Sequence, residues 1–307
     1  MVKPRALAPG DRLAIVAPAS PFDRAEFDEG VDELQRLGFV AVYDDSVFAR
    51  QQYVAGSPET RAAAIQAAWS DPTIAGVIGV RGGYGSAQVL PFLDPAAARR
   101  AAKPFIGYSD LTAVLTFLTV NCGVVAFHGP MLAGRLGRRE AGYDRRSFEQ
   151  ALCRAEPMGE LAPPSVESIR PGDARGTLLG GTLTQLLSSL GTPYAFAPPP
   201  DYVLFLDEVG ERPFRLDRMV TQLRQTGLLS RASAVVIGEL PRCDEPSGDL
   251  TGRAVMARLL ADFPGPVIVG FPSGHTTSPA MTLPFGVTAR VVGGPHPRLI
   301  IEEGAVR

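Results

Sequence analysis

The sequence has few of the residues that build metal sites and disulfide frameworks. Among its 307 residues there are three cysteines and three histidines. Cys122, Cys153 and Cys243 lie far apart in the chain, so the close spacings typical of zinc sites and of small disulfide-stabilised folds are absent. We therefore expect free, mostly buried thiols in a reducing compartment, and neither a metal ion nor an organic cofactor.

The chain also lacks an excess of one charge and a long apolar run. Thirty Lys and Arg residues nearly balance 32 Asp and Glu residues, so no basic surface for nucleic acid or for a membrane is indicated. No segment reaches the roughly 20 apolar residues that span a bilayer. The apolar stretch 13–19 is short and contains Pro18, which argues against a signal peptide. We expect a cytoplasmic protein without membrane or nucleic-acid partners.

Strand and helix patterns alternate over residues 13–128. Short apolar runs predict strands, and segments with apolar residues at helical spacing separate them. This alternation favours an α/β fold with a parallel sheet covered by helices on both faces. The expected strands cover 13–17, 40–43, 75–80, 104–108 and 124–128, and the expected helices cover 24–37, 59–69 and 111–120.

A change of composition after Leu132 indicates a domain boundary. Residues 134–145 are polar and charged, and residues 155–175 contain four prolines and little periodicity. We predict a first domain of residues 1–140, a linker of residues 141–175 and a mixed α/β domain of residues 176–307. Beyond the boundary, strands are expected at 203–206, 234–238, 267–269, 282–283, 288–292 and 298–301, and helices at 147–154, 183–190, 213–226 and 253–263.

The stretch IGYSDLT (106–112) places a serine between a predicted buried strand and a predicted helix. Such a corner lies at the carboxyl edge of a parallel sheet, where open α/β folds bind ligands. A tight corner would direct the Ser109 hydroxyl outward, as in a nucleophile elbow, beside the free N–H groups of a helix that starts at Asp110. Ser109 could instead serve only as the N-cap of that helix, a position that serine favours.

A glycine-rich segment, GVRGGYGSAQVL (79–90), follows another predicted strand. Its glycines match neither the dinucleotide-binding fingerprint nor a Walker loop with its lysine. The segment could still bind a phosphate, could lend a backbone N–H to an oxyanion hole shared with the amide after Ser109, or could form only a tight turn.

A serine nucleophile needs a base and an acid that orients the base. His275 lies in a polar loop just after a predicted strand, His128 ends another strand and could line the site or be buried, and His296 has a surface-turn context. Asp207 and Glu208 follow the strand at 203–206. Because neighbouring strand residues point to opposite faces, only one of these two carboxylates should face the histidine.

Seven segments, in this order, resemble the L,D-carboxypeptidases of serine peptidase family S66, which also includes the microcin C immunity peptidases. The resemblance implies a flavodoxin-like N-terminal domain with a doubly wound parallel sheet, a C-terminal mixed α/β domain, a homodimer, and a Ser-His-acid triad that works without a metal or cofactor. The segments are PGDRLAIVAPASP (9–21), RGGYGSAQVLPFLD (81–94), IGYSDLTAVL (106–115), HGPM (128–131), LGGTLTQL (179–186), LFLDEVGERPFRLDRM (204–219) and GHTTSPAMTLPFG (274–286).

Carried over to this chain, the resemblance implies specific site residues. Ser109 would be the nucleophile and His275 the general base. The family's glutamate is replaced by Asp207, which we favour as the acid, with Glu208 as the alternative. Many members have Asn where this chain has Thr182. The amides of the oxyanion hole would come from Gly82, Gly83 and Asp110, and weaker candidates for substrate contact are Arg81, Tyr84 and His128.

The function implied is that of a hydrolase in peptidoglycan recycling. The enzyme would cleave the L,D amide bond that releases the terminal D-Ala from a murein tetrapeptide, through an acyl-enzyme. Two alternatives stay open: a peptidase of the same family that cleaves peptidyl-nucleotide (microcin-type) or other amide toxins, and an inactive muropeptide-binding module. An aromatic-rich insertion able to stack a base would favour the toxin substrate, and Trp69 alone does not provide one.

Overall fold

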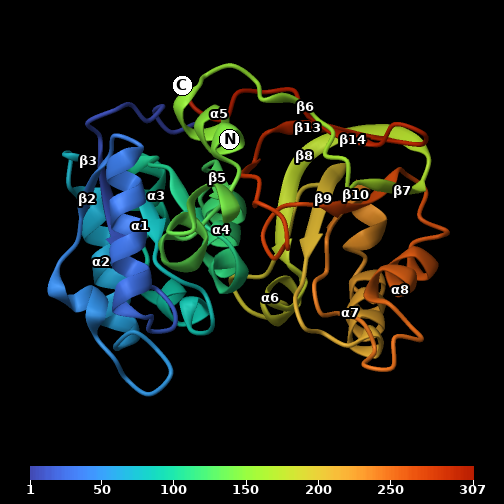
Figure 1. The fold of residues 1–307 in the computed structure, drawn as a ribbon, viewed down its shortest axis with the longest axis horizontal. Helices are drawn as coiled ribbons and strands as arrows, with labels where there is room; N and C mark the ends of the chain where they lie inside the picture. The colour runs from blue at the N-terminus through green and yellow to red at the C-terminus, as the bar shows by residue number, and fades with distance from the viewer.

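Five short apolar runs of the N-terminal half form the parallel part of the first, six-stranded sheet of the computed structural model, which describes residues 1–307 (Figure 1). These strands are parallel in the order β2-β1-β3-β4-β5, which is the flavodoxin-like order. Except for the edge strand β2 they are almost entirely buried, as strands covered on both faces are. They are β1 (Arg12–Val16), β2 (Val40–Val42), β3 (Ile74–Gly79), β4 (Phe105–Gly107) and β5 (Ala126–His128).

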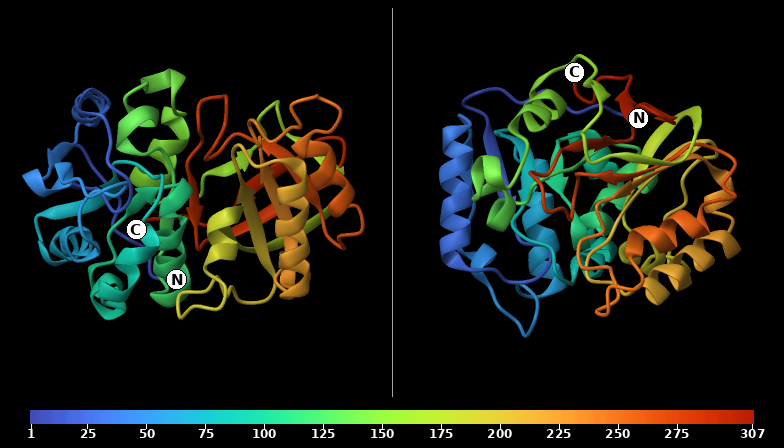
Figure 2. Two further views of the ribbon diagram at one scale, coloured as in Figure 1. Left: turned by 90° about the horizontal axis from the view of Figure 1, so that it is seen from below. Right: turned by 45° about the vertical axis from the view of Figure 1, so that its right-hand side comes forward.

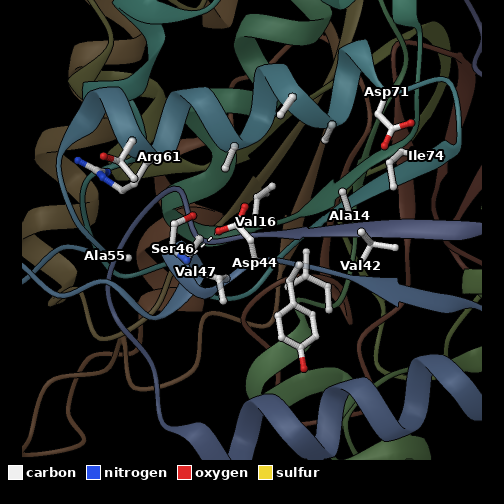
Figure 3. A pocket seen from close by; sticks show the side chains of 17 residues that line it. Ala14, Val16, Val42, Asp44, Ser46, Val47, Ala55, Arg61, Asp71 and Ile74 are labelled. Carbon is white, nitrogen blue, oxygen red and sulfur yellow. Dashed lines mark hydrogen bonds between the residues drawn. The ribbon is translucent and has the colours of Figure 1, made fainter.

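Helices cover both faces of this sheet. Helix α1 (Arg24–Arg36) and helix α2 (Pro58–Ser70) lie on opposite sides of β1 and β2 (Figure 3). Both helices begin within a residue of the starts expected at 24 and 59, and Asp23 and Ser57 cap them by accepting hydrogen bonds from the backbone of the first turn. The further helical segments include α3 (Pro95–Ala101), which the sequence patterns did not predict, α4 (Thr112–Thr116), and a π-helical turn (Phe117–Asn121) that continues α4.

The second sheet has eight strands and is mixed. Its central strands β8, β9, β10 and β11 are parallel, and the outer strands pair antiparallel in the order β6-β14-β13-β8-β9-β10-β11-β7. The strands are β6 (Gly159–Leu161), β7 (Glu167–Arg170), β8 (Gly172–Thr182), β9 (Tyr202–Asp207), β10 (Ala232–Gly238), β11 (Val267–Phe271), β13 (Thr288–Gly293) and β14 (Arg298–Ile301). The helices of this half are α6 (Leu183–Ser188), α7 (Pro213–Gln225) and α8 (Gly252–Leu259).

The segment 141–175, for which its composition predicted a linker, contains regular structure. Helix α5 (Arg145–Cys153) lies in it, and so do β6, β7 and the first residues of β8. Of these elements the sequence patterns indicated only the helix, at 147–154. Pro163 and Pro164 lie between the edge strands β6 and β7, where a missing N–H is tolerated, and the role of the segment as a linker is still a prediction. The assignment of residues 1–140 and 176–307 to two domains stays a prediction.

The two halves lie side by side and are joined by more than the covalent chain (Figures 1 and 2). Strand β12 (Leu283–Phe285) comes from the C-terminal half but pairs antiparallel with β5, so that it extends the first sheet. The C-terminal Arg307 also exchanges backbone hydrogen bonds with Pro4 and Ala6. One buried apolar core runs through both halves, and Trp69 lies within it. None of the helices combines the length and the apolar character needed to cross a membrane.

Candidate active site

Ser109 lies at the corner directly after β4, at the start of a 3₁₀ turn (Ser109–Leu111) that leads into α4. Its φ angle is +63°, a left-handed conformation that a serine adopts only when its surroundings impose it. The side chain does not cap the helix, because Tyr108 and Leu111 occupy the capping positions of the turn and of α4, and neither cap bond involves a side chain. Of the two interpretations open from the sequence, the geometry therefore favours an outward-facing hydroxyl.

His275 meets this hydroxyl from the loop that follows β11. Its Nε2 atom lies 3.0 Å from Ser109 Oγ, and its Nδ1 atom lies 2.7 Å from Asp207 Oδ2. The carboxylate can only accept, so Nδ1 carries the proton and Nε2 is free to accept the proton of the serine. Gly274 makes this approach possible: its φ is +71°, and a Cβ atom there would lie 2.3 Å from Asp207 Oδ2.

Asp207 is the last residue of β9 and is fully buried. Besides the His275 ring, the His275 backbone N–H donates to Oδ2 at 2.9 Å, and the Thr182 hydroxyl donates to Oδ1 at 2.8 Å. Burial alone would raise the pKa of Asp207, but the adjacent His275 and its two N–H groups outweigh that effect and lower it to about 2. Asp207 is therefore an anion at neutral pH.

Glu208 points away from the histidine and has a different role. Its Oε2 atom accepts hydrogen bonds from the Thr184 backbone at 2.9 Å and from the Thr184 hydroxyl at 2.6 Å, and Oε1 accepts from the Val209 N–H at 3.0 Å. These bonds fasten the first turn of α6 to the end of β9. Burial raises the pKa of Glu208, and the Thr184 bonds partly oppose that rise. The structure thus brings Asp207, and not Glu208, to His275.

The glycine segment lies against Ser109. A Cβ atom on Gly82 would lie 3.2 Å from Ser109 Oγ and 3.3 Å from the Asp110 backbone nitrogen. The Gly82 carbonyl accepts from the Ser20 N–H, and because the peptide is planar and trans, the Gly83 N–H points the opposite way. The space beside Ser109 is thus bordered by Gly82 and the Asp110 amide, with the Gly83 N–H as the second candidate donor.

Ser86 joins this segment to the turn that begins at Ser109. Its backbone N–H donates to Asp110 Oδ2 at 2.8 Å, and its hydroxyl donates to the Asp110 carbonyl at 2.5 Å. Burial raises the pKa of Asp110, and the hydrogen bonds from Ser86 oppose that rise. The Asp110 side chain is therefore part of the frame of the site, while only its amide borders the space beside Ser109.

The three weaker candidates for substrate contact lie in different settings. Arg81 is exposed. Tyr84 is 52% exposed and packs edge-to-face on Tyr53, which is 60% exposed, with the ring centroids 5.5 Å apart. His128 is 0% exposed and lies behind Asp207, so the expectation that it contacts substrate is corrected: the end of β5 is covered by β12 and by the His275 loop. His296 is exposed, as its context predicted.

Two residues that the sequence patterns did not single out hold the His275 loop. The Arg135 guanidinium donates to the carbonyls of Gly274 at 3.3 Å, Thr276 at 2.5 Å and Ser278 at 3.3 Å. From the other side, Glu239 Oε2 accepts from the Thr277 N–H and hydroxyl, both at 2.7 Å. An arginine in the polar stretch 134–145 was the available signal for Arg135, but polarity alone indicates an exposed loop.

A cavity of about 300 Å³ lies apart from these residues, between α2 and the strands β1 and β2 (Figure 3). Its lining includes alanines of α2 and apolar residues of β1, and no residue of the Ser109–His275–Asp207 set borders it. Arg61 at its border directs its guanidinium to the carbonyls of Pro18 and Gly85. The cavity is thus separate from the site around Ser109.

Comparison with known proteins is consistent with this geometry. The family model for the N-terminal domain of LD-carboxypeptidases matches residues 13–129, and the model for the C-terminal domain matches residues 175–291. A Streptomyces coelicolor protein, provisionally named a carboxypeptidase, is 37% identical over 302 residues, which cover 95% of this chain and 93% of that protein. The murein tetrapeptide carboxypeptidase of Pseudomonas aeruginosa is 29% identical over 289 residues, covering 92% of this chain and 93% of that enzyme.

A solved structure has the same fold over the whole chain. The structure of MccF in complex with glutamyl sulfamoyl guanosine covers 100% of both chains with a TM-score of 0.90, at 22% sequence identity. Fold and site together define a serine-type peptidase of two α/β halves. The chain belongs to the LD-carboxypeptidase family, peptidase family S66.

Proposed function

We propose that this chain is a serine carboxypeptidase that hydrolyses the L,D amide bond before the terminal D-Ala of murein tetrapeptides. The supporting observation is the hydrogen-bonded chain Ser109–His275–Asp207, with distances of 3.0 and 2.7 Å. The similarity to a murein tetrapeptide carboxypeptidase supplies the substrate class. Residues 1–140 carry the nucleophile and residues 176–307 carry the base and acid in this proposal, which places the reaction between the two halves.

The first half of the reaction uses the proton acceptor beside the serine. As Ser109 Oγ attacks the carbonyl carbon of the scissile bond, His275 Nε2 takes the hydroxyl proton, and Asp207 stabilises the imidazolium. The oxyanion forms in the space beside Gly82, within reach of the amides of Gly83 and Asp110. His275 then donates its proton to the nitrogen of D-Ala, the C–N bond breaks, and the acyl-enzyme is left.

The second half returns the enzyme to its starting state. Water attacks the acyl carbon while His275 Nε2 accepts one of its protons, and collapse of the intermediate releases the shortened peptide and the Ser109 hydroxyl. The D-Ala carboxylate requires a cation or amide donors when it is bound, and the exposed Arg81 next to Gly82 is the candidate in the glycine segment.

A second candidate substrate has an observation in its favour. The exposed ring pair of Tyr53 and Tyr84 stands beside the glycine segment and offers a surface on which a nucleobase or a sugar ring could stack. This keeps a peptidyl-nucleotide substrate as the alternative to a murein peptide, in a protein with the fold of MccF.

Mass spectrometry decides between the two. We expect incubation with a disaccharide tetrapeptide to yield the tripeptide and free D-Ala, with no turnover by the Ser109→Ala variant. An aminoacyl sulfamoyl adenosine, incubated in parallel, should be cut at least about a hundredfold more slowly in kcat/KM. Cleavage of the nucleotide compound alone would overturn the murein assignment. If the folded protein cleaved neither compound, the inactive muropeptide-binding module would be the remaining interpretation of the chain.

A further inference from the structure

A second histidine lies behind the acid of the triad and takes no part in the reaction described above. His128 is fully buried at the end of β5, its ring stacked on Phe285 and edge-to-face against Phe205. Its Nε2 atom points to the Asp207 oxygen that His275 does not use, but at 3.9 Å, and that nitrogen has no hydrogen-bond partner. A hydrogen bond between these atoms would bring them to about 2.8 Å.

Counting protons explains this long distance. His128 Nδ1 lies 3.1 Å from Ser273 Oγ, and Ser273 Oγ lies 2.8 Å from the Met281 carbonyl oxygen. The carbonyl can only accept, so the single hydroxyl proton of Ser273 goes to Met281. The other contact then needs a proton on His128 Nδ1. A neutral imidazole with its proton on Nδ1 has a lone pair on Nε2, which cannot donate to Asp207.

The surroundings keep His128 neutral. Burial lowers the pKa of His128 to about 4, although the negative charge of Asp207 acts in the opposite direction. The other ionisable rings that face it are His275 and Tyr108, and burial raises the pKa of Tyr108, so that the phenol is uncharged. Arg135 lies beyond Tyr108 and binds the carbonyls of the His275 loop.

We propose that Ser273 holds His128 in the Nδ1–H tautomer, so that this buried imidazole withholds its proton from Asp207 and leaves the charge of the carboxylate to His275. His128 and Ser273 are positioning residues in this scheme, since neither touches the reacting atoms. The proposal rests on the assignment of Ser109, His275 and Asp207 in the proposed function. It assigns to the histidine of the HGPM segment and to the serine before Gly274 a role in setting the strength of the base.

Removing the Ser273 hydroxyl should reverse the tautomer. In Ser273→Ala, Nδ1 loses its acceptor, the proton moves to Nε2, and a small rotation lets Nε2–H donate to Asp207 Oδ1. A carboxylate that accepts this extra bond stabilises the His275 imidazolium less, so His275 becomes a weaker base. The acid limb of the pH profile should therefore move to lower pH, by roughly one to two units for one hydrogen bond to a charged group, and the plateau rate should fall.

The reaction of Ser109 with a fluorophosphonate measures this limb without any assumption about the natural substrate. Ser109 Oγ bonds to phosphorus, fluoride leaves, and His275 takes the proton. We expect the limb to shift in Ser273→Ala and to return to its wild-type position in Ser273→Ala/His128→Phe, where no imidazole is left to donate. Ser147→Ala, which removes another buried hydroxyl that binds Thr282 next to β12, should leave the limb in place.

Nitrogen-15 NMR of histidine-labelled protein reads the tautomer directly, with the His128→Phe spectrum as the assignment. We expect a protonated Nδ1 and an unprotonated Nε2 in the wild type, and the reverse in Ser273→Ala. A protonated Nε2 in the wild type overturns the proposal even where Ser273→Ala does not fold, and so does a limb shift that persists in the double variant. Absence of a Ser109-dependent reaction with the fluorophosphonate would instead reject the proposed function, and the NMR result would still test His128.

Discussion

The carboxylates of Asp207 and Glu208 are consecutive in the chain but bind on opposite sides of β9: Asp207 Oδ2 lies 2.7 Å from His275 Nδ1, and Glu208 Oε2 lies 2.6 Å from Thr184 Oγ1. The alternation of a strand produces this separation. One carboxylate therefore faces the Ser109 site and the other fixes the start of α6.

This separation predicts different effects of the two amide substitutions. Asp207→Asn should reduce kcat/KM by at least about a hundredfold, because the imidazolium of His275 loses its counter-charge; about 10⁴ in kcat is the size of such a loss in chymotrypsin-like enzymes. Glu208→Gln should reduce it by less than about tenfold. Asp207→Glu, which restores the residue usual in the family, should retain measurable activity. A severe loss in Glu208→Gln beside a near-normal Asp207→Asn would show that the assignment of the acid is wrong.

Ser109→Ala should abolish turnover and leave the fold intact. The side chain contributes one hydroxyl, and the strained φ of +63° is kept by alanine. Loss of a triad nucleophile costs several orders of magnitude in kcat. The variant should melt within a few degrees of the wild type. If it kept more than about a tenth of the wild-type kcat/KM, Ser109 could not be the nucleophile.

Gly82→Ala tests the space for the oxyanion. A methyl group there would lie 3.2 Å from Ser109 Oγ and 3.3 Å from the Asp110 nitrogen, so it would occupy the position of the developing negative charge. We expect kcat to fall by at least about tenfold, towards the hundredfold seen when one oxyanion donor is lost. Thermal melting is the control for folding. If the folded variant had an unchanged kcat, the oxyanion would not form in the space beside Gly82.

Arg135→Lys tests the support of the His275 loop. The guanidinium reaches three carbonyls of this loop, and an ammonium group cannot match that forked geometry. We expect kcat to fall by roughly tenfold with a smaller change in KM, because the base is misplaced while the substrate surface is kept. Arg138→Lys, at an exposed position three residues further along, is the matched control and should leave kcat unchanged. Equal kcat values for the two variants would reject the role of Arg135.

The stability of the fold should depend on pH through His128. Its pKa is lowered from 6.5 to about 4 in the fold, so in this window the unfolded chain binds the proton and the folded chain does not. Stability is thus fully present above about pH 6.5 and is lost as the pH falls towards 4, by roughly 2 to 3 kcal/mol. In urea titrations at pH 7 and pH 4.5, His128→Phe should lose less free energy of unfolding than the wild type. Equal losses would contradict the neutral state of His128.

The sequence predicted the parts of the molecule in which local pattern and tertiary structure agree. The parallel strands of the first sheet are mostly apolar, and the alternation rule predicted that only one of the two carboxylates after β9 would face the histidine. The helices expected at 24–37 and 59–69 correspond to α1 and α2, whose apolar spacing depends only on nearby residues. In these places the residues of a short segment are sufficient to predict its secondary structure.

The sequence could not predict features that depend on distant backbone. Strand β8 contains glycines, which are typical of loops. In the structure Gly180 lies so close to β9 that a Cβ atom on it would be 1.9 Å from the carbonyl oxygen of Phe205. A strand was expected at 282–283, but three residues with Pro284 among them carry no signal that β12 pairs with β5 of the first sheet rather than with its own half. In the sequence Arg135 has the pattern of an exposed charged residue, because the carbonyls of the His275 loop that it binds lie about 140 residues further along the chain.

The pairing of β12 with β5 also has a consequence for synthesis of the chain. Leu283 pairs with His128 across 155 residues, which a ribosome adds in about 8 to 30 s at roughly 5–20 residues per second. Throughout that interval the outer edge of β5 has no neighbouring strand, and an uncovered strand edge is a template for association with other chains. The N-terminal half therefore emerges as an incomplete sheet, and its protection against aggregation comes from the last tenth of the polypeptide.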